Sequence, residues 1–185
     1  MKRTLKIILI TICLLFLLRG QVFRLLVYYI PIQQIHLPNE IQPFSSAMAP
    51  YMEANHVSIE KEIQRALNFT SQTLYFTTAN TSQQLLQLLE NSKANCIGYG
   101  NFFKHRLQFQ LKNGELVDQY ELQQWRGKLY ILGWDLHSLF DDPFWKDHDF
   151  NIIIDKKTGE QIAVDATLFD YSGIRKVRLG TATAN

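Results

Sequence analysis

The residue with the most recognisable chemistry in this sequence is Cys96, in the segment 95–100 that reads Asn-Cys-Ile-Gly-Tyr-Gly. Asn95 is a favourable N-cap, so the pattern predicts that a helix begins at Cys96. The unpaired N–H groups and partial positive charge of a helix N-terminus favour ionisation of a thiol, and the thiolate is the reactive form. Cys96 is therefore interpreted as a nucleophile, with a small buried apolar residue as the alternative.

A thiolate nucleophile needs a base to accept its proton, and histidine is the side chain to look for. His105 would lie about 13 Å along the same helix from Cys96 and on another side of it, which argues against this residue. His137 falls in a predicted loop and stays open as a second choice. His148 is preferred, because it lies on a predicted strand with a carboxylate on the next strand.

That carboxylate is Asp165, and its expected position follows from strand pairing. Alternating apolar residues predict strands over 147–155 and 160–168, separated by a four-residue turn. If the strands pair directly across this turn, Phe150 lies opposite Asp165, and His148 lies on the same face as both. Asp165 could then orient the imidazole toward Cys96, whereas a slip of one residue would turn it away.

Two other interpretations of this region remain open. Asp147, His148 and Asp149 form a charge cluster at the start of a strand, and such clusters are commonly solvated. A metal site built from His148, Asp147 and Asp165 is conceivable, but no second histidine stands at a ligand-like spacing. We expect neither a metal nor a cofactor.

The elements that would position these residues begin with helices. An apolar stripe after Ser58 predicts a first helix, and Thr81 followed by Gln84 has the form of a capping box that opens a second. A short extended piece over 73–78 lies between them. The third helix begins at Cys96 and should end before the turn pair at 113–114.

From residue 116 onward the apolar period changes from helical to alternating. The segments 120–125 and 128–132 read as a β-hairpin with its turn at 126–127, and 135–145 as a loop or short helical turn. The order is helices first and antiparallel strands second, which predicts an α+β fold.

The N-terminus has the pattern of a membrane segment. Basic residues precede the apolar run 7–18, no small-residue cleavage site follows, and four prolines lie between 31 and 51. We expect a membrane anchor over 1–30, an extended spacer over 31–56 and one domain over 57–185. The basic end should stay cytoplasmic, which places the domain on the exported side of the cell membrane, periplasmic or extracellular. A cleaved signal peptide is the alternative.

The charge distribution argues against a nucleic-acid partner. The first 30 residues hold five of the 19 basic residues and none of the 17 acidic ones, so the remainder has 14 basic residues and a net charge of −3. That remainder shows no Lys/Arg cluster in the sequence. The other cysteine, Cys13, lies in the leader, so the domain cannot form an internal disulfide, and Cys96 is its only thiol.

Three short segments in this order resemble the sequence boxes of the transglutaminase-like core of the papain-like cysteine enzymes. The segment 95–100 is similar to the cysteine box of that family. His148-Asp149-Phe150 resembles its His-x-aromatic box, and 164–167, Val-Asp-Ala-Thr, resembles its Val-Asp-x-Thr box. The resemblance covers residues of about 60 to 170, and it implies helices packed on an antiparallel sheet with Cys96, His148 and Asp165 as a catalytic triad.

The chemistry that the resemblance implies is attack of the Cys96 thiolate on an amide or acyl carbon, with His148 handling the proton and Asp165 orienting the ring. The sequence departs from the family at Phe150, where tryptophan is frequent, and at Ile97, where a tryptophan or a polar residue is common. Neither change removes a catalytic group. The Cys96 N–H is one oxyanion donor. The second is unassigned, with Tyr75, Asn80, Gln83 and Gln84 as choices.

Two functions follow as hypotheses. The first is a membrane-anchored, exported thiol acyl-transfer enzyme, a cysteine peptidase or amidase that acts on a protein or peptide substrate. The second is a catalytically inactive transglutaminase-like binding module, accessory to a membrane or envelope complex. The complete Cys/His/Asp set favours the first, and the small size of the domain favours the second.

Overall fold

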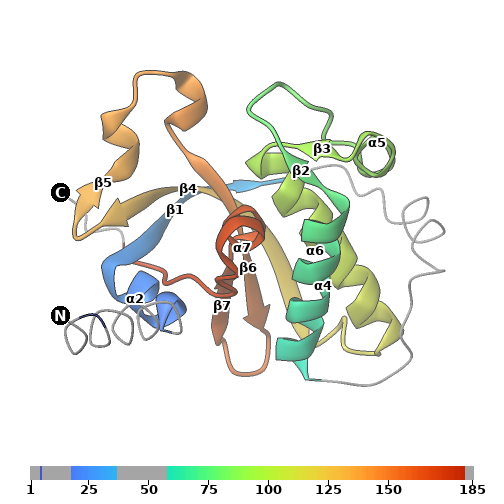
Figure 1. Cartoon of the computed structure of the whole chain (residues 1–185). Helices are drawn as coiled ribbons and strands as arrows, with labels where there is room; N and C mark the ends of the chain where they lie inside the picture. The colour runs from blue at the N-terminus through green and yellow to red at the C-terminus, as the bar shows by residue number, and fades with distance from the viewer. Residues whose placement is uncertain (1–4, 6–17, 37–57, 182–185) are drawn as a thin grey trace.

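A computed structural model describes residue 5 and the ranges 18–36 and 58–181, and this part of the chain has the expected α+β architecture (Figure 1). The main sheet is antiparallel throughout, in the order β1-β4-β6-β7, with the short strand β5 paired to β4. Its strands are β1 (Val27–Ile35), β4 (Tyr120–Ile131), β5 (Trp134–Asp135), β6 (His148–Asp155) and β7 (Gln161–Val164).

Helices form a second layer against this sheet. In chain order the described helices are α2 (Arg19–Leu26), α4 (Ile59–Thr73), α5 (Leu85–Asn91), α6 (Cys96–Asn113) and α7 (Ala166–Ser172). Strands β2 (Tyr75–Phe76) and β3 (Lys93–Ala94) form a small parallel pair immediately before α6. In Figure 1 helices α4 and α6 lie side by side, with α6 toward the sheet.

Alternation along the strands separates the apolar interior into two clusters. The larger cluster joins α4, α5 and α6 to sheet residues such as Ile153 and Val164. The smaller cluster lies around Tyr29, Phe150 and Ile152 of β1 and β6. Successive residues of β6 therefore pack in different clusters, with Ile152 in the smaller one and Ile153 in the larger one. Strand β6 contacts helix α6, and its Phe150 contacts Tyr29 of β1.

The predicted register of the last two strands is confirmed. Asn151 pairs with Val164 and Ile152 with Ala163, as direct pairing across the 156–159 turn requires. The predicted length of the second strand is wrong, because β7 ends at Val164 and Asp165 becomes the N-cap of α7. Aspartate favours that position, since its carboxylate accepts a backbone N–H of the first helical turn.

The predicted hairpin over 120–132 is also wrong, because the segment is one continuous strand. Gly127 lies within β4 and pairs with Pro31 on one side and His148 on the other. A Cβ on this glycine would lie 2.5 Å from the Ile30 carbonyl oxygen and 2.7 Å from the Phe150 ring. Glycine is therefore required here for close packing within a sheet and not for a turn.

Strand β1 corrects the predicted domain boundaries. It occupies 27–35, which we assigned to the anchor and the spacer, and pairs with β4 along its length. Val27 and Tyr29 are buried, but Pro31 and a register shift between Pro31 and Gln33 interrupt the alternation that would have revealed the strand. The segments 6–17 and 37–57, which carry most of the predicted anchor and spacer, lie outside the described residues. Within the described ranges, no helix combines the length and apolar character needed to span a membrane.

The earlier elements follow the sequence more closely. Ser58 is the N-cap of α4 and Asn95 is the N-cap of α6. Helix α6 ends at Asn113, one residue later than predicted. Helix α5 begins at Leu85, later than the capping box at Thr81 predicted. The Thr81 hydroxyl is buried without a hydrogen-bond partner in the described part of the chain, so it does not cap this helix.

Replacing Gly127 should test the close packing of β1, β4 and β6. We expect Gly127→Ala to lower the free energy of unfolding by about 1–3 kcal/mol, because the added Cβ must displace both a backbone carbonyl and a buried ring. Chemical denaturation of the purified chain measures this. Gly20→Ala in α2 is the matched control, since its Cβ would meet only the Arg24 side chain at 3.9 Å. Equal stability of the two variants would contradict the packing seen at Gly127.

Candidate functional site

Cys96 is the first residue of α6 and is 8% exposed. The Asn95 side-chain oxygen accepts a hydrogen bond from the Gly98 N–H at 3.2 Å, so the helix begins where the sequence predicts. No acidic residue lies in the first turn. The thiol therefore lies at the positive end of an 18-residue helix, in an almost fully buried position.

Side-chain amides of the sheet hold this first turn in place. The Gln124 Nε2 donates to the Ile97 carbonyl at 3.0 Å, and the Asn151 Nδ2 donates to the Gly100 carbonyl at 3.1 Å. A Cβ on Gly100 would lie 3.0 Å from the Gln124 Nε2. Because Gly100 has no Cβ, the helix can approach the sheet closely enough to form both hydrogen bonds. This close approach explains the presence of a glycine near the start of the helix.

His148 and Asp165 are brought together by the confirmed register. His148 is the first residue of β6, and its Nε2 lies 2.8 Å from the Asp165 Oδ2. The Asp165 side chain is 2% exposed and the His148 side chain 20%. The Cys96 thiol is a second hydrogen-bonding partner of the same imidazole, so the ring contacts both the thiol and the carboxylate.

Tyr29 of β1 completes the surroundings of Asp165. Its hydroxyl donates to the Asp165 Oδ2 at 2.7 Å, and its ring contacts both the His148 ring and the Phe150 ring edge-on. The Leu168 N–H donates to the other carboxylate oxygen at 2.9 Å. Tyr29 is absent from the residues predicted for this site because it lies in the segment assigned to the anchor. The sequence of 27–32, Val-Tyr-Tyr-Ile-Pro-Ile, does not alternate between apolar and polar residues, so no local signal marked the strand.

The electrostatics of the pair favour its charged form. Burial alone would lower the pKa of His148, but the Asp165 charge and hydrogen bond, followed by the contact with Cys96, outweigh it and hold the pKa well above 6.5. Burial would raise the pKa of Asp165, yet His148, the Leu168 N–H and Tyr29 hold it below 3.8. Burial and the neighbouring carboxylate raise the pKa of Tyr29, so its hydroxyl remains a donor.

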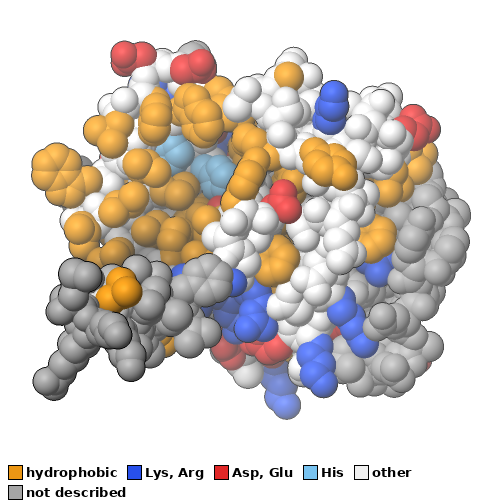
Figure 2. All heavy atoms as spheres, viewed as in Figure 1, with side chains coloured by type: hydrophobic (Ala, Val, Ile, Leu, Met, Phe, Trp, Pro, Cys, Tyr) orange, Lys and Arg blue, Asp and Glu red, His pale blue; other side chains and the backbone are white. Residues whose placement is uncertain are grey.

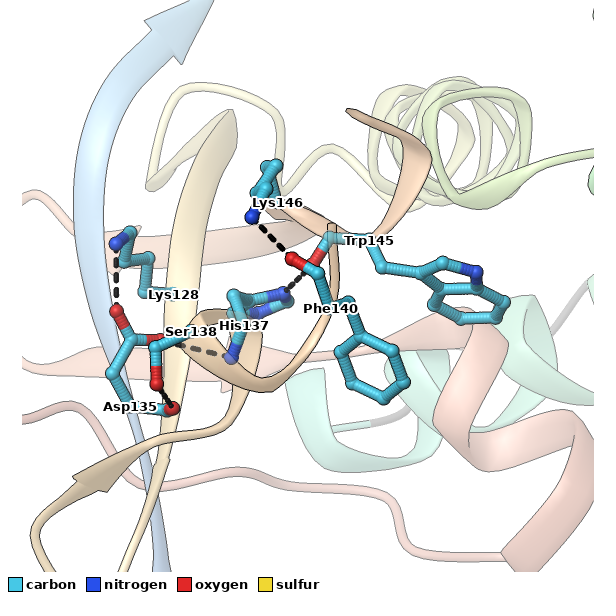
Figure 3. A network of polar contacts seen from close by, with 7 residues as sticks. All are labelled: Lys128, Asp135, His137, Ser138, Phe140, Trp145 and Lys146. Carbon is cyan, nitrogen blue, oxygen red and sulfur yellow. Dashed lines mark hydrogen bonds and ion pairs between the residues drawn. The ribbon is translucent and has the colours of Figure 1, made fainter. Parts of the chain in front are cut away.

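The loop that leads into His148 is held by its own polar network (Figure 3). Asp135 accepts from the Lys128 ammonium at 2.6 Å and from the His137 N–H at 2.9 Å. The His137 Nδ1 lies 2.6 Å from the Trp145 carbonyl oxygen, and the Lys146 ammonium donates to the Phe140 carbonyl. These contacts join two 3₁₀ turns, η2 (Leu136–Leu139) and η3 (Pro143–Trp145), to the β4–β5 end of the sheet.

The same loop carries exposed apolar side chains. Figure 2 shows histidine side chains within an area of hydrophobic side chains on this face of the molecule. Leu139, Phe140 and Trp145 of the loop are exposed, while Phe144 contacts Phe76 of β2 at 6.3 Å between ring centroids. An apolar surface therefore borders the polar site, as is common where a protein holds an organic ligand.

The other predicted residues take structural positions. His105 stays within α6, with its Nδ1 3.0 Å from the Asn101 carbonyl oxygen, and His137 belongs to the loop network. Asp147 lies 3.5 Å from Arg126, which also approaches the buried Asp149. In the part of the chain that is described, no group of three or more His, Cys, Asp and Glu side chains is arranged to hold a metal ion.

The second oxyanion donor remains a prediction. Tyr75, Asn80, Gln83 and Gln84 are all exposed, and among the described contacts none joins any of these side chains to Cys96. Gln83 is held beside α6 through its carbonyl, which accepts from the Asn101 side chain at 2.8 Å. This part of the chain therefore contacts α6 through its backbone, while the amide side chains of Asn80, Gln83 and Gln84 are exposed to solvent.

Comparison with models of known protein families, with curated proteins and with solved structures finds no match for this chain.

Removing the Tyr29 hydroxyl should weaken the support of Asp165. We expect Tyr29→Phe to lower the free energy of unfolding by about 1.5–3 kcal/mol, because a buried carboxylate loses a hydrogen bond that Phe cannot replace. Urea denaturation measures the effect. Tyr28→Phe, in the same strand and stacked on Tyr130, is the matched control and should change stability by less than about 0.5 kcal/mol. A loss no larger in Tyr29→Phe than in this control would contradict the role of the hydroxyl.

The raised pKa of His148 predicts a pH dependence of stability. The protonated ring is favoured in the folded state, so its contribution is complete below pH 6.5 and is lost as the pH rises through the raised folded pKa. In that interval stability should fall by at most about 1.4 kcal/mol per pH unit. His148→Gln should remove this slope, and the exposed His36→Gln should retain it. Unfolding free energies measured from pH 5 upward test this, and an unchanged slope in His148→Gln would contradict the assignment.

Proposed function

We propose that this chain is a membrane-anchored, exported thiol acyl-transfer enzyme, a cysteine peptidase or amidase with a transglutaminase-like core. The observation that carries the proposal is the convergence of Cys96, His148 and Asp165 from separate elements, with the imidazole between the thiol and a buried carboxylate. A nucleophile, a base and an orienting group in this order are the parts that thiol catalysis requires. The resemblance of the three sequence boxes supports the same family.

The proposed reaction begins with ionisation of the Cys96 thiol, whose proton passes to His148. The thiolate attacks the carbonyl carbon of an amide, and the carbonyl oxygen becomes an oxyanion that the Cys96 N–H stabilises. The C–N bond then breaks, the amine leaves with the proton from His148, and a thioester on Cys96 remains. Water attacks the thioester, His148 takes its proton, and the C–S bond breaks to release a carboxylic acid and the thiol.

The role of Asp165 in this cycle is to hold the His148 ring in one orientation and to favour its protonated form. Because Tyr29 and the Leu168 N–H already bond the carboxylate, Asp165 does not need to move when the imidazole gains or loses a proton. The apolar side chains of the 136–145 loop border the site and would contact the substrate beside the scissile bond. A protein or peptide with apolar side chains fits that surface.

The proposed location follows from the leader. Basic residues at the extreme N-terminus and the apolar run 7–18 support a single-pass anchor with its first residues in the cytoplasm. The described range 18–36 starts at the last residue of that run and enters α2 at Arg19. The domain would then act close to the outer surface of the cell membrane.

An activated ester tests the chemistry without knowledge of the substrate. We expect the purified chain to release p-nitrophenol from p-nitrophenyl acetate and to carry an acetyl group on Cys96, located by peptide mass spectrometry. His148→Ala should slow acylation about 10²–10⁴-fold, because the base is lost. Asp165→Asn should slow it as well, since the ring loses its orientation.

Cys13→Ser is the matched control, because it removes the only other thiol and should leave the rate unchanged. Cys96→Ser should abolish the adduct. If Cys96 acetylates no faster in the parent chain than in His148→Ala, the enzyme proposal fails. The catalytically inactive binding module then becomes the better description of this fold.

A further inference from the structure

A basic cavity lies beneath α2, away from the Cys96 site. It has a volume of about 450 Å³ and is bordered by α2, the start of α4 and the segment that follows α7. Its charged lining consists of Arg19, Arg24, Glu60, Arg175 and Lys176. Figure 2 shows Lys and Arg side chains gathered on this part of the visible face.

The cavity has an excess of positive charge. Glu60 is its single acidic lining residue, and this carboxylate is bonded to the Lys176 ammonium at 2.6 Å. Within the described ranges, neither Arg24 nor Arg175 takes part in an ion pair. Arg24 also borders an adjoining hollow that is lined by Arg178. Because residues 31–185 have a net charge of −3, this concentration of guanidinium groups is a local feature and does not reflect the average charge.

The backbone at the end of α7 is shaped to admit one of these side chains. Gly173 caps the helix with φ 68°, a left-handed conformation that favours glycine. A Cβ at this position would lie 2.8 Å from an Arg19 guanidinium nitrogen. Arg19 therefore lies directly against the end of α7, where the negative end of the helix dipole favours a cation.

We propose that this cavity binds a phosphate-bearing anion. Arginine presents a planar set of N–H donors that matches the oxygens of phosphate, and several such groups around one hollow are the usual means of holding it. Two sources share this chemistry, an anionic phospholipid headgroup and free phosphate. The apolar run 7–18 ends next to Arg19, so the headgroup is the source that position favours.

Phosphate binding itself does not depend on the proposed acyl-transfer activity, since none of Cys96, His148 and Asp165 lines the cavity. Only the choice of the lipid source depends on the proposed membrane location. A failure of either idea can therefore be recognised separately, because ester hydrolysis reports on Cys96 and anion binding reports on the arginines.

Isothermal titration of the full chain in an uncharged detergent tests the proposal. The probes are sodium phosphate, dihexanoyl phosphatidylglycerol and dihexanoyl phosphatidylcholine. We expect phosphatidylglycerol to bind more tightly than phosphatidylcholine, and Arg24→Gln/Arg175→Gln to raise its Kd about tenfold or more. Lys112→Gln/Lys157→Gln removes the same charge from exposed positions outside the cavity and should change Kd less than about twofold.

Arg24→Lys/Arg175→Lys keeps the charge and should recover part of the affinity, which also shows that the double variant has not lost binding through misfolding. Equal binding of phosphatidylglycerol and sodium phosphate would support the phosphate site and overturn the lipid source. Absence of binding by both anions would overturn the proposal. An equal rise in Kd for Arg24→Gln/Arg175→Gln and for the control Lys112→Gln/Lys157→Gln would overturn it as well.

Discussion

The buried carboxylate of Asp165 is the constraint on which the site depends. An ionised carboxylate removed from water costs several kcal/mol unless its oxygens are bonded, so its partners are a requirement of folding as much as of chemistry. Tyr29, His148 and the Leu168 N–H supply three donors from β1, β6 and α7. The imidazole orientation is thus set by a group that must be satisfied for the chain to fold.

Cys96 is positioned by a second and separate set of contacts. The carbonyls of Ile97 and Gly100 each accept a side-chain amide from the sheet in addition to serving the helix. These amides belong to Gln124 and Asn151, which are a cross-strand pair of β4 and β6. His148 also lies on β6, so the same strand positions both the imidazole and, through Asn151, the helix that carries the Cys96 thiol. Movement of α6 relative to His148 would break buried hydrogen bonds.

The sequence was sufficient where local rules acted alone. The four-residue turn at 156–159 determined the register that brings Asp165 to His148, and Asn95 marked the start of α6. It failed where distant backbone decided the outcome. Gly127 resembled a turn because nothing local shows that Ile30 and Phe150 pack against it. Tyr29 was missed because Pro31 and a register shift hide the alternation of β1.

The position of β1 also changes how the leader relates to the domain. A spacer of about 25 residues after the apolar run would have allowed the site to move freely above a membrane. Instead α2 follows residue 18 directly and passes into β1, and Tyr29 of that strand bonds Asp165. Eight helical residues span about 12 Å, and the two steps from Val27 to Tyr29 add about 7 Å. The chain that carries the leader is therefore the chain that supports the carboxylate, so an anchored leader would hold the site within a few tens of ångströms of the bilayer.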